Sequence, residues 1–314
     1  MATRSSFKLG TRASALAITQ SETVAQALVK LTGLYVELVK ITTPGDDTSL
    51  PFSSIPQPGV FVSSLREALM AGQVDLIVHS YKDLPSAPVA GLTVAAVPLR
   101  EDPRDVLVSR SGRSLQDLPS GAVVGTSSPR RAARVLHLRP DLVVKPIRGN
   151  VDSRITKVMQ GEYDATVLAA AGLNRLGRLS EATQIFDIDD FIPAPAQGAL
   201  AVECRSDDTE LLSALQQLND APSRLLATTE RAVLIAVGAS CTTAIGALAT
   251  WVNGNLTVAA ELSDETTDEH ERVLVEAPIG DATLVSEAHQ LGMMAGHKLM
   301  QTELGKRLGN VAKN

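Results

Sequence analysis

The centre of the chain reads Ala122-Val123-Val124-Gly125-Thr126-Ser127-Ser128-Pro129-Arg130-Arg131. Its apolar start predicts a strand, and the polar residues that follow predict the first turn of a helix. Ser128 is suited to cap that helix and Pro129 to occupy its first position. A strand that leads directly into a helix is the repeating unit of α/β proteins. This stretch therefore sets the expected fold class.

The same alternation extends over the first two thirds of the chain. A helix is predicted from Val60 to Ala71, with Gly72 as its stop. Strands are predicted at residues 35–41, 74–78, 92–97, 106–109, 122–125, 142–147 and 165–169. Strands separated by helices indicate βαβ units and mostly parallel sheets. Pro and Gly cluster at Pro98–Pro103 and Pro193–Gly198, which predicts hinges there.

The last third has a different pattern. Consecutive strands are predicted at residues 244–249, 256–260 and 272–276, with a polar turn at Asn253-Gly254-Asn255. One long amphipathic helix is predicted from Ala282 to Leu304. Strands followed by a helix predict a small α+β domain.

Composition excludes several classes of protein. The chain has 314 residues, 44% hydrophobic and 20% charged, which is typical of a globular protein with two or three domains. Only 3% of residues are aromatic and the formal net charge is −6, which disfavours a nucleic-acid partner. No apolar run approaches the ~18 residues of a membrane span, and the start lacks the apolar stretch of a signal peptide. We therefore expect a cytoplasmic protein without a membrane partner.

Cysteine and histidine usage limits the chemistry further. The two cysteines, Cys204 and Cys241, form no disulfide framework and no Cys-x-x-Cys metal clip. The five histidines show no metal-ligand spacing, so we expect no metal site. Nucleotide-binding glycine loops are also absent from the sequence. If the protein is an enzyme, its chemistry therefore uses either no cofactor or one that is covalently attached.

Charge is distributed unevenly along the chain. Between Thr126 and Lys157, eight cationic residues stand against Asp141 and Asp152, a local net charge of +6. Residues 220–314 carry seven basic and twelve acidic residues, a local net charge of −5. A cationic segment within an acidic protein predicts a specific anion site rather than general polyanion binding.

Two turns concentrate this positive charge. Thr126–Arg131 follows a predicted strand, and Arg148-Gly149-Asn150-Val151-Asp152-Ser153-Arg154 repeats the arrangement after the next one. A carboxylate or phosphate group would be bound well here, by backbone amides at the helix start together with hydroxyl and guanidinium groups. The alternative is that these arginines are solvated at the helix starts. Because an arginine there opposes the helix dipole, we favour the anion site.

Three other segments are candidates. His79-Ser80-Tyr81-Lys82-Asp83 follows a buried strand, where a carboxylate can stabilise a cation and move a proton, although a solvated Lys-Asp turn is the better interpretation of this segment taken alone. Thr11-Arg12-Ala13-Ser14 starts a helix and, taken alone, is an ordinary cap. The small-residue loop around Cys241 could expose a reactive thiol or simply bury a cysteine, whereas Cys204 lies in an alternating strand pattern typical of a structural residue.

Taken together, seven segments in order resemble the porphobilinogen deaminase (hydroxymethylbilane synthase) family across essentially the whole chain. They are Thr11–Ser14, His79–Pro85, Arg100–Asp105, Gly125–Ser128 with Arg130-Arg131, Arg148–Asn150, Pro195–Ala199 and the Cys241 loop.

The resemblance implies two lobes similar to those of periplasmic binding proteins, with a cleft between them, and a third α+β domain. It places the first lobe at residues 1–98 with 198–217, the second at 99–197 and the third domain at 218–314. It also implies a monomeric transferase that joins four porphobilinogen molecules head to tail, with release of ammonia, in tetrapyrrole (haem) biosynthesis.

Family roles transfer to matching positions of this chain. The resemblance implies a dipyrromethane cofactor held by a thioether to Cys241, with Asp83 as the catalytic carboxylate. It implies that the cofactor is also bound by Ser80, Lys82, Asp83, Thr126, Ser127, Ser128, Arg130, Arg131, Arg148 and Gly149. It implies that porphobilinogen is bound by Arg12, Ser14, Arg148, Arg154 and Gln197. The arginine-rich turns suit this substrate, because each porphobilinogen carries an acetate and a propionate.

Three departures from the family pattern stand out. Residues 53–59 contain no basic residue, although many family members carry lysines there, and Ala239-Ser240 stands where glycine is common. Pro129 replaces a residue that is usually apolar, which agrees with its expected place at the first position of a helix.

Two other classes of protein share part of this pattern. A two-lobed anion-binding protein would explain the arginine turns but not the third domain or Cys241. An effector-binding transcriptional regulator would need a basic DNA-reading helix, which neither end of the chain provides.

Overall fold

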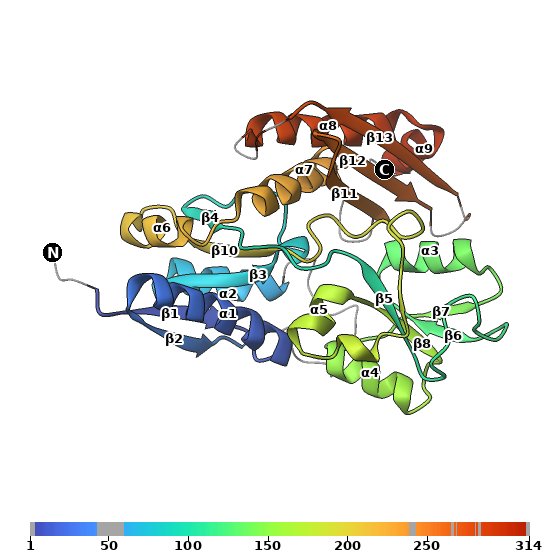
Figure 1. Ribbon diagram of the computed structural model, residues 1–314, viewed down its shortest axis with the longest axis horizontal. Helices are drawn as coiled ribbons and strands as arrows, with labels where there is room; N and C mark the ends of the chain where they lie inside the picture. The colour runs from blue at the N-terminus through green and yellow to red at the C-terminus, as the bar shows by residue number, and fades with distance from the viewer. Residues whose placement is uncertain are drawn as a thin grey trace. The chain divides into compact units, whose positions relative to one another are not determined.

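The structure is a computed structural model that describes residues 4–42, 60–238, 243–264, 267, 269–279, 281 and 284–311 (Figure 1). The chain divides into two compact units. Unit 1 comprises Met1–Glu101 and Ala199–Arg224, and unit 2 comprises Asp102–Gly198 and Leu225–Asn314. The three-domain boundaries expected from the sequence stay a prediction.

Unit 1 is built on a five-stranded sheet with the order β2-β1-β3-β10-β4. Its strands are β1 (Ser6–Thr11), β2 (Tyr35–Lys40), β3 (Leu76–Ser80), β4 (Leu92–Ala96) and β10 (Leu200–Arg205). Strand β1 pairs in parallel with β2 and β3, whereas β10 runs antiparallel to β3 and β4. Four strands therefore share one direction, and the strand that returns late in the sequence opposes them.

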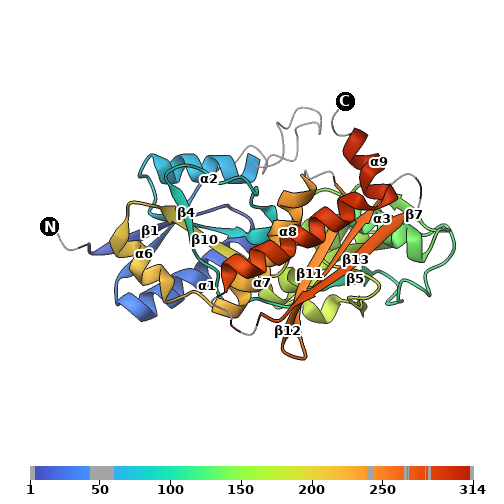
Figure 2. The same cartoon turned by 90° about the horizontal axis from the view of Figure 1, so that it is seen from above.

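Helices cover both faces of this sheet (Figure 2). Helices α1 (Ala15–Thr32) and α6 (Thr209–Gln216) pack on one face, where Leu28 and Leu211 join a core with the sheet residues Leu9 and Leu76. Helix α2 (Val60–Met70) lies on the other face through a second buried cluster. As predicted, α2 stops before Gly72, which has a positive φ of 69°.

The first sheet of unit 2 repeats this topology. Its order is β7-β6-β8-β5-β9, with β6 parallel to β7 and β8, and β5 antiparallel to β8 and β9. The strands are β5 (Asp105–Ser109), β6 (Val123–Gly125), β7 (Val143–Lys145), β8 (Ala165–Ala169) and β9 (Gln184–Ile185). The predicted α/β class with two similar lobes is confirmed.

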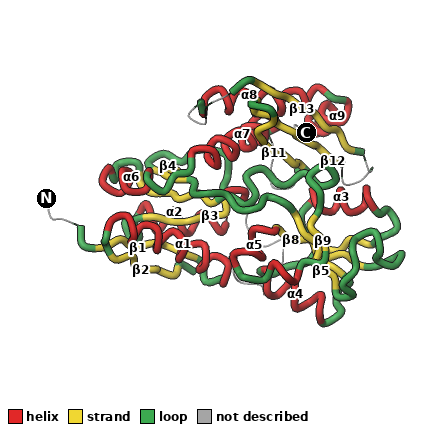
Figure 3. The backbone as a smooth tube through the Cα atoms, in the orientation of Figure 1, coloured by secondary structure: helices red, strands yellow, loops and turns green. Residues whose placement is uncertain are grey.

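Helix α3 (Pro129–Leu138) packs on one face of this second sheet through Val135. Helices α4 (Val151–Met159) and α5 (Ala170–Arg175) pack on the other face, where Ile155 and Leu173 share a separate buried cluster. Figure 3 shows this alternation of helices and strands. The starts of α3 and α4 are therefore fixed by packing on a rigid sheet, which matters because both carry predicted site residues.

The rest of unit 2 is the expected α+β part. An antiparallel sheet has the order β11-β12-β13 and packs against helices α7 and α8. The hairpin between β11 and β12 turns at Asn253 and Gly254, which both have positive φ, as a tight two-residue turn requires. The elements are α7 (Ala221–Val237), β11 (Ile245–Val252), β12 (Asn255–Ser263), β13 (His270–Ala277), α8 (Val285–Gln301) and α9 (Glu303–Val311).

The prediction of a single C-terminal helix is wrong. Helix α8 ends at Gln301, and α9 starts two residues later. The Thr302 hydroxyl donates to the carbonyl oxygen of Leu299 at 2.7 Å and accepts the Gly305 amide at 3.1 Å. Thr302 thus ends one helix and caps the next, a competition with the backbone that an apolar periodicity does not reveal.

Among the described residues, no helix is both long enough and apolar enough to cross a bilayer. In the same part of the chain, His, Cys, Asp and Glu side chains nowhere form a group of three suited to a metal ion.

Close packing between α7 and α8 yields the first prediction. A β-carbon at Gly292 would lie 2.0 Å from the Thr229 carbonyl oxygen and 2.8 Å from the Ala232 β-carbon. Alanine is the better helix former by about 1 kcal/mol, but overpacking costs about 1–3 kcal/mol or more. Gly292→Ala should therefore lower the free energy of unfolding, measured by urea denaturation. The control is Met294→Ala, at a 51% exposed position of the same helix, which should change it little. Equal stability of both variants would contradict this packing.

Candidate functional site

The unit 1 candidates lie at the carboxyl ends of β1 and β3. These strands are parallel neighbours, with Gly10 beside Ile77, and β2 lies on the far side of β1. The chain passes from β1 to β2 on one side and then returns to β3 on the other, so the strand order reverses between β1 and β3. Open α/β sheets bind ligands at such a point. Arg12 and Ser14 follow β1, and Lys82 and Asp83 follow β3.

Asp83 is exposed at the end of a single 3-10 turn, Tyr81–Asp83. The Tyr81 amide donates to the Ala199 carbonyl oxygen at 3.0 Å, and the Leu84 amide donates to that of Tyr81 at 3.3 Å. Leu84 itself is 4% exposed and anchors the turn in the core. Because the buried Leu84 side chain holds the turn in place, the Asp83 backbone is fixed while its carboxylate remains accessible to solvent.

Ser14 and Ser80 both have structural partners. Ser14 caps α1, and its hydroxyl accepts the Ala17 amide at 3.4 Å. The Gln20 side-chain amide donates to the Ser80 hydroxyl at 3.0 Å and so ties α1 to the end of β3. The ordinary-cap interpretation of Ser14 is thus correct locally, and its substrate contact stays a prediction.

Beneath this edge lies a buried cluster that was not identified from the sequence. The Glu203 carboxylate accepts two hydrogen bonds from Arg66, each 2.8 Å, and its Oε2 lies 3.4 Å from His79 Nε2. Burial raises the pKa of Glu203, but the bonds from His79 and Arg66 outweigh burial and hold that pKa below its usual value. The cluster links β10 and α2 to β3, the strand that precedes the Asp83 turn.

The unit 2 candidates lie at the equivalent edge of the second sheet. Thr126, Ser127 and Ser128 follow β6, and Arg148 and Gly149 follow the neighbouring parallel strand β7. The Ser127 hydroxyl donates to the Ile147 carbonyl oxygen at 2.8 Å and accepts the Ile147 amide at 3.1 Å. One serine therefore joins the two cationic turns, which the sequence predicted as separate motifs.

Both helix starts are built as expected. The Ser128 hydroxyl accepts the Arg131 amide at 3.5 Å with Pro129 in the first turn of α3, and Asn150 caps α4 through the Ser153 amide at 2.9 Å. Gly149 has a φ of 111°, and a β-carbon there would lie 2.0 Å from the Ser153 hydroxyl oxygen. Glycine is required at this turn.

The arginines of α3 are more buried than the sequence suggested. Arg130 and Arg131 are 4% and 7% exposed, and both pair with Asp105, which is 0% exposed. Arg131 donates to Asp105 Oδ1 from Nε at 3.0 Å and from Nη2 at 2.7 Å, and Arg130 Nη2 lies 2.8 Å from Oδ2. Burial lowers the pKa of Arg130, and the charge of Asp105 opposes that shift.

Gln197 completes this cluster. It is 0% exposed, and its side-chain amide donates to Asp105 Oδ1 at 3.1 Å and to the Pro103 carbonyl oxygen at 2.6 Å. Arg131 in turn donates to the Gln197 side-chain oxygen at 3.4 Å. The Gln197 side chain thus contacts Asp105, Arg131 and the Pro103 carbonyl oxygen, and its contact with substrate stays a prediction.

The cations of the second turn have different partners. Arg154 is half-buried and donates from Nε to the Gly149 carbonyl oxygen at 2.8 Å, and Lys157 donates to that of Arg148 at 3.3 Å. These contacts gather the Arg154 and Lys157 side chains around the Gly149 turn. Guanidinium and ammonium groups are the side chains that bind carboxylates most strongly, so this turn is the candidate for an anionic ligand in unit 2.

Of the two cysteines, only Cys204 falls among the described residues. It is 0% exposed in β10, and burial raises the pKa of its thiol to about 11. A buried thiol that resists ionisation cannot serve as an attachment nucleophile. Cys241 lies outside the described residues, as do residues 53–59 and Ala239-Ser240.

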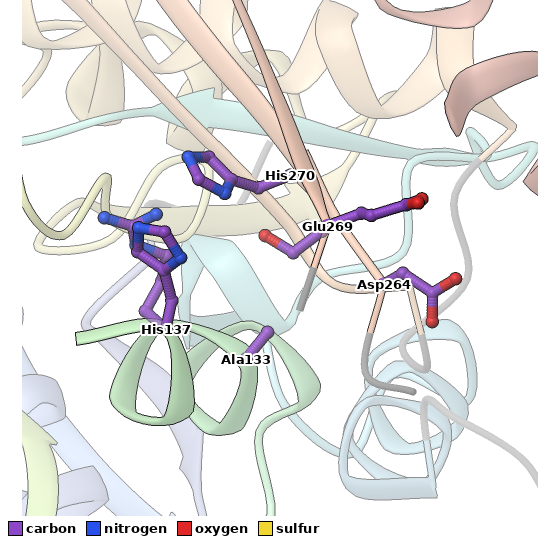
Figure 4. Close-up of a pocket in the computed structure, with 7 residues that line it drawn as sticks. Ala133, His137, Asp264, Glu269 and His270 are labelled. Atoms are coloured by element: carbon purple, nitrogen blue, oxygen red, sulfur yellow. The ribbon is translucent and has the colours of Figure 1, made fainter. Parts of the chain in front are cut away.

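Two hollows elsewhere in unit 2 do not match the expected ligand. A cavity of about 10 Å³, with room for one water, lies between α3 and the C-terminal sheet (Figure 4). Its lining includes Ala133, His137, Asp264, Glu269 and His270. A wider hollow of about 440 Å³ is lined by Glu269, Glu271 and Glu303 together with Arg307. Its acidic lining is unsuited to a ligand rich in carboxylates.

Comparison with known proteins places these residues in a family. A family model described as porphobilinogen deaminase, dipyromethane cofactor binding domain, matches residues 7–213. Porphobilinogen deaminase 1 of Streptomyces coelicolor is 52% identical over 251 residues, which cover 79% of each chain. Porphobilinogen deaminase of Nocardia farcinica is 46% identical over 309 residues, 98% of this chain and 85% of the relative. Among solved structures, the Bordetella pertussis BvgS VFT2 domain is 20% identical with a TM-score of 0.44, over 69% of this chain and 88% of that one.

The Asp105 cluster yields the second prediction. Asp105→Asn would leave two buried guanidinium groups without their counter-charge, a change that costs about 3–5 kcal/mol when one partner of a buried pair is removed. The loss of unfolding free energy can be measured by urea denaturation followed by circular dichroism. The control is Asp141→Asn, which removes an exposed carboxylate from Arg139. Because water screens that pair, the control should change stability little. Similar stability of the two variants would contradict the buried pairing.

Proposed function

We propose, because the chain belongs to the porphobilinogen deaminase family, that it joins four porphobilinogen molecules head to tail into the linear tetrapyrrole hydroxymethylbilane. Each condensation releases ammonia. The observation that carries this proposal is the match over residues 7–213, which contains every described candidate of the site. The proposal includes a monomer that acts in the cytoplasm, and the net charge of −6 supports the absence of a nucleic-acid partner.

The donors around the cationic turns suit the family's dipyrromethane cofactor. Its pyrrole rings carry carboxylates, and the unit 2 edge offers the Ser128 hydroxyl, which acts as an acceptor in the α3 cap, together with the cationic residues Arg148 and Arg154. The Ser127 hydroxyl donates to Ile147, so the cofactor contact expected for Ser127 stays a prediction. When bound, the dipyrromethane supplies the primer from which the tetrapyrrole is built. We propose that Cys241 holds it through a thioether, since the buried Cys204 is unsuited to that role.

Binding of substrate is assigned to the arginines. The acetate and propionate of porphobilinogen each accept hydrogen bonds in the paired geometry that guanidinium groups offer. We assign these contacts to Arg12 in unit 1 and to Arg148 and Arg154 in unit 2. With their carboxylates held, the ring and its aminomethyl group are oriented for reaction, which lowers the entropic part of the barrier.

Asp83 is assigned the chemical step. Loss of ammonia from the aminomethyl group of porphobilinogen leaves a cation conjugated with the pyrrole ring. An ionised carboxylate beside it lowers the energy of that cation. When the carbon of the next pyrrole attacks, one proton leaves that carbon, and Asp83 can accept it. One carboxylate thus serves both halves of the step.

The covalent attachment is tested by intact mass under denaturing conditions, followed by peptide mapping. The wild-type protein should carry an adduct of two pyrrole units on the Cys241 peptide, either as purified or after incubation with porphobilinogen. Cys204→Ala should keep the adduct, and Cys241→Ala should lose it. An adduct on Cys204, or an unmodified mass after incubation, would sink the proposal.

The role of Asp83 is tested by Asp83→Asn, which keeps the shape of the side chain but removes its charge. Turnover should fall by about 10²–10⁴, the usual contribution of a positioned acid–base group, while KM changes little. The matched control is Glu67→Gln at an exposed carboxylate of α2 in the same unit. Near wild-type turnover in Asp83→Asn would show that another group performs the step.

A further inference from the structure

The turn at Pro195–Gly198 contains an unusual backbone conformation. Ala196 has a φ of 61°, and among the described residues only Asn253 shares a positive φ without being glycine. A β-carbon makes this left-handed region unfavourable, and alanine has no polar side chain to offset the cost. Ala196 is also 0% exposed, so the surrounding structure must hold this conformation.

A buried carboxylate on α7, that of Glu230, binds the backbone of this turn. Glu230 is 0% exposed, its Oε2 accepts the Ala196 amide at 2.6 Å, and its Oε1 accepts the Ala249 amide of β11 at 2.9 Å. Both oxygens therefore bind main-chain groups. By contrast, Glu261 in the same unit pairs with the arginine side chains Arg134 and Arg272.

The turn held by Glu230 leads directly to the arginine cluster. Gln197 is the next residue, and its amide donates to Asp105 and to the Pro103 carbonyl oxygen. Asp105 in turn binds Arg130 and Arg131 at the start of α3. A continuous chain of short contacts thus runs from α7 through Ala196 and Gln197 to the first turn of α3.

We propose that Glu230 is a positioning residue that holds Ala196 in its left-handed conformation, so that Gln197 fixes Asp105 and the two arginines at the start of α3. Without it, the turn relaxes, Gln197 withdraws from Asp105, and the guanidinium groups lose their fixed orientation. The consequence for porphobilinogen binding rests on the proposed function. The consequence for the turn and the arginine cluster does not.

Two readouts test the proposal in the holoenzyme. Glu230→Gln places an NH₂ donor against one of the two main-chain amides and removes the negative charge that strengthens both hydrogen bonds, so the contact with Ala196 is lost or weakened in either orientation of the side chain. Hydrogen exchange of the peptide that spans residues 193–199 should speed up by about tenfold, the factor that corresponds to a loss of about 1.4 kcal/mol in local opening. The KM for porphobilinogen should rise several-fold, with a smaller change in kcat.

A second substitution separates positioning from simple loss of stability. Ala196→Gly removes the β-carbon that makes positive φ costly, so glycine can keep the turn without the carboxylate. The double variant Glu230→Gln/Ala196→Gly should therefore have a KM close to that of the wild-type protein. It should also fold even if Glu230→Gln alone does not. Glu261→Gln is the matched control, because it removes a buried carboxylate of the same unit and should leave exchange at residues 193–199 unchanged.

The outcomes are distinct. Unchanged exchange in folded Glu230→Gln, an equal effect of Glu261→Gln on this turn, or a double variant that is neither rescued nor folded would each overturn the proposal. Faster exchange that Ala196→Gly corrects, in a protein that never consumes porphobilinogen, would uphold the positioning role and overturn the proposed function instead.

Discussion

The paired burial of Asp105 with Arg130 and Arg131 is the constraint on which the unit 2 edge depends. Two guanidinium groups lie inside the protein, and both pair with a single carboxylate that is fully removed from solvent. Isolated charges are costly in such surroundings, so the pairing must form whenever the unit folds. Because both arginines sit in the first turn of α3, the ion pairs also set where that helix begins.

This constraint divides the cations of the central segment into two groups. Arg130 and Arg131 both pair with Asp105, and Arg134 lies 3.5 Å from Glu261. Arg154 and Lys157 instead donate to carbonyl oxygens around the Gly149 turn. We infer that the first group shapes the edge, and the second group lies at the turn where we propose contacts with a ligand that carries carboxylates. Porphobilinogen and the dipyrromethane are both of that kind.

Much of the architecture could be predicted from local signals. Ser128 and Pro129 identified the start of α3, Gly149 the tight turn before α4, and Asn253-Gly254 the β11–β12 hairpin. Each depends on conformational preferences that a few neighbouring residues express. The break at Thr302 was missed because a hydroxyl that competes with the backbone leaves the apolar periodicity intact.

The balance of charge at the site could not be predicted in the same way. Counting from Thr126 to Lys157 gave a net +6, but the counter-charge of Arg131 lies 26 residues earlier, at the start of β5. The only local signal was an aspartate that opens the apolar run Val106-Leu107-Val108. No sequence pattern indicated the role of Glu230, because its partners are main-chain amides that only the tertiary fold brings next to it.

Condensation of porphobilinogen with loss of its amino group fixes the stoichiometry of the reaction. Purified protein is incubated with porphobilinogen, and the ammonia released, the substrate consumed and the linear tetrapyrrole formed are each quantified. We expect one ammonia per porphobilinogen consumed and four per tetrapyrrole released. Binding of porphobilinogen without ammonia or tetrapyrrole would contradict this expectation and would mark the chain as a binding protein.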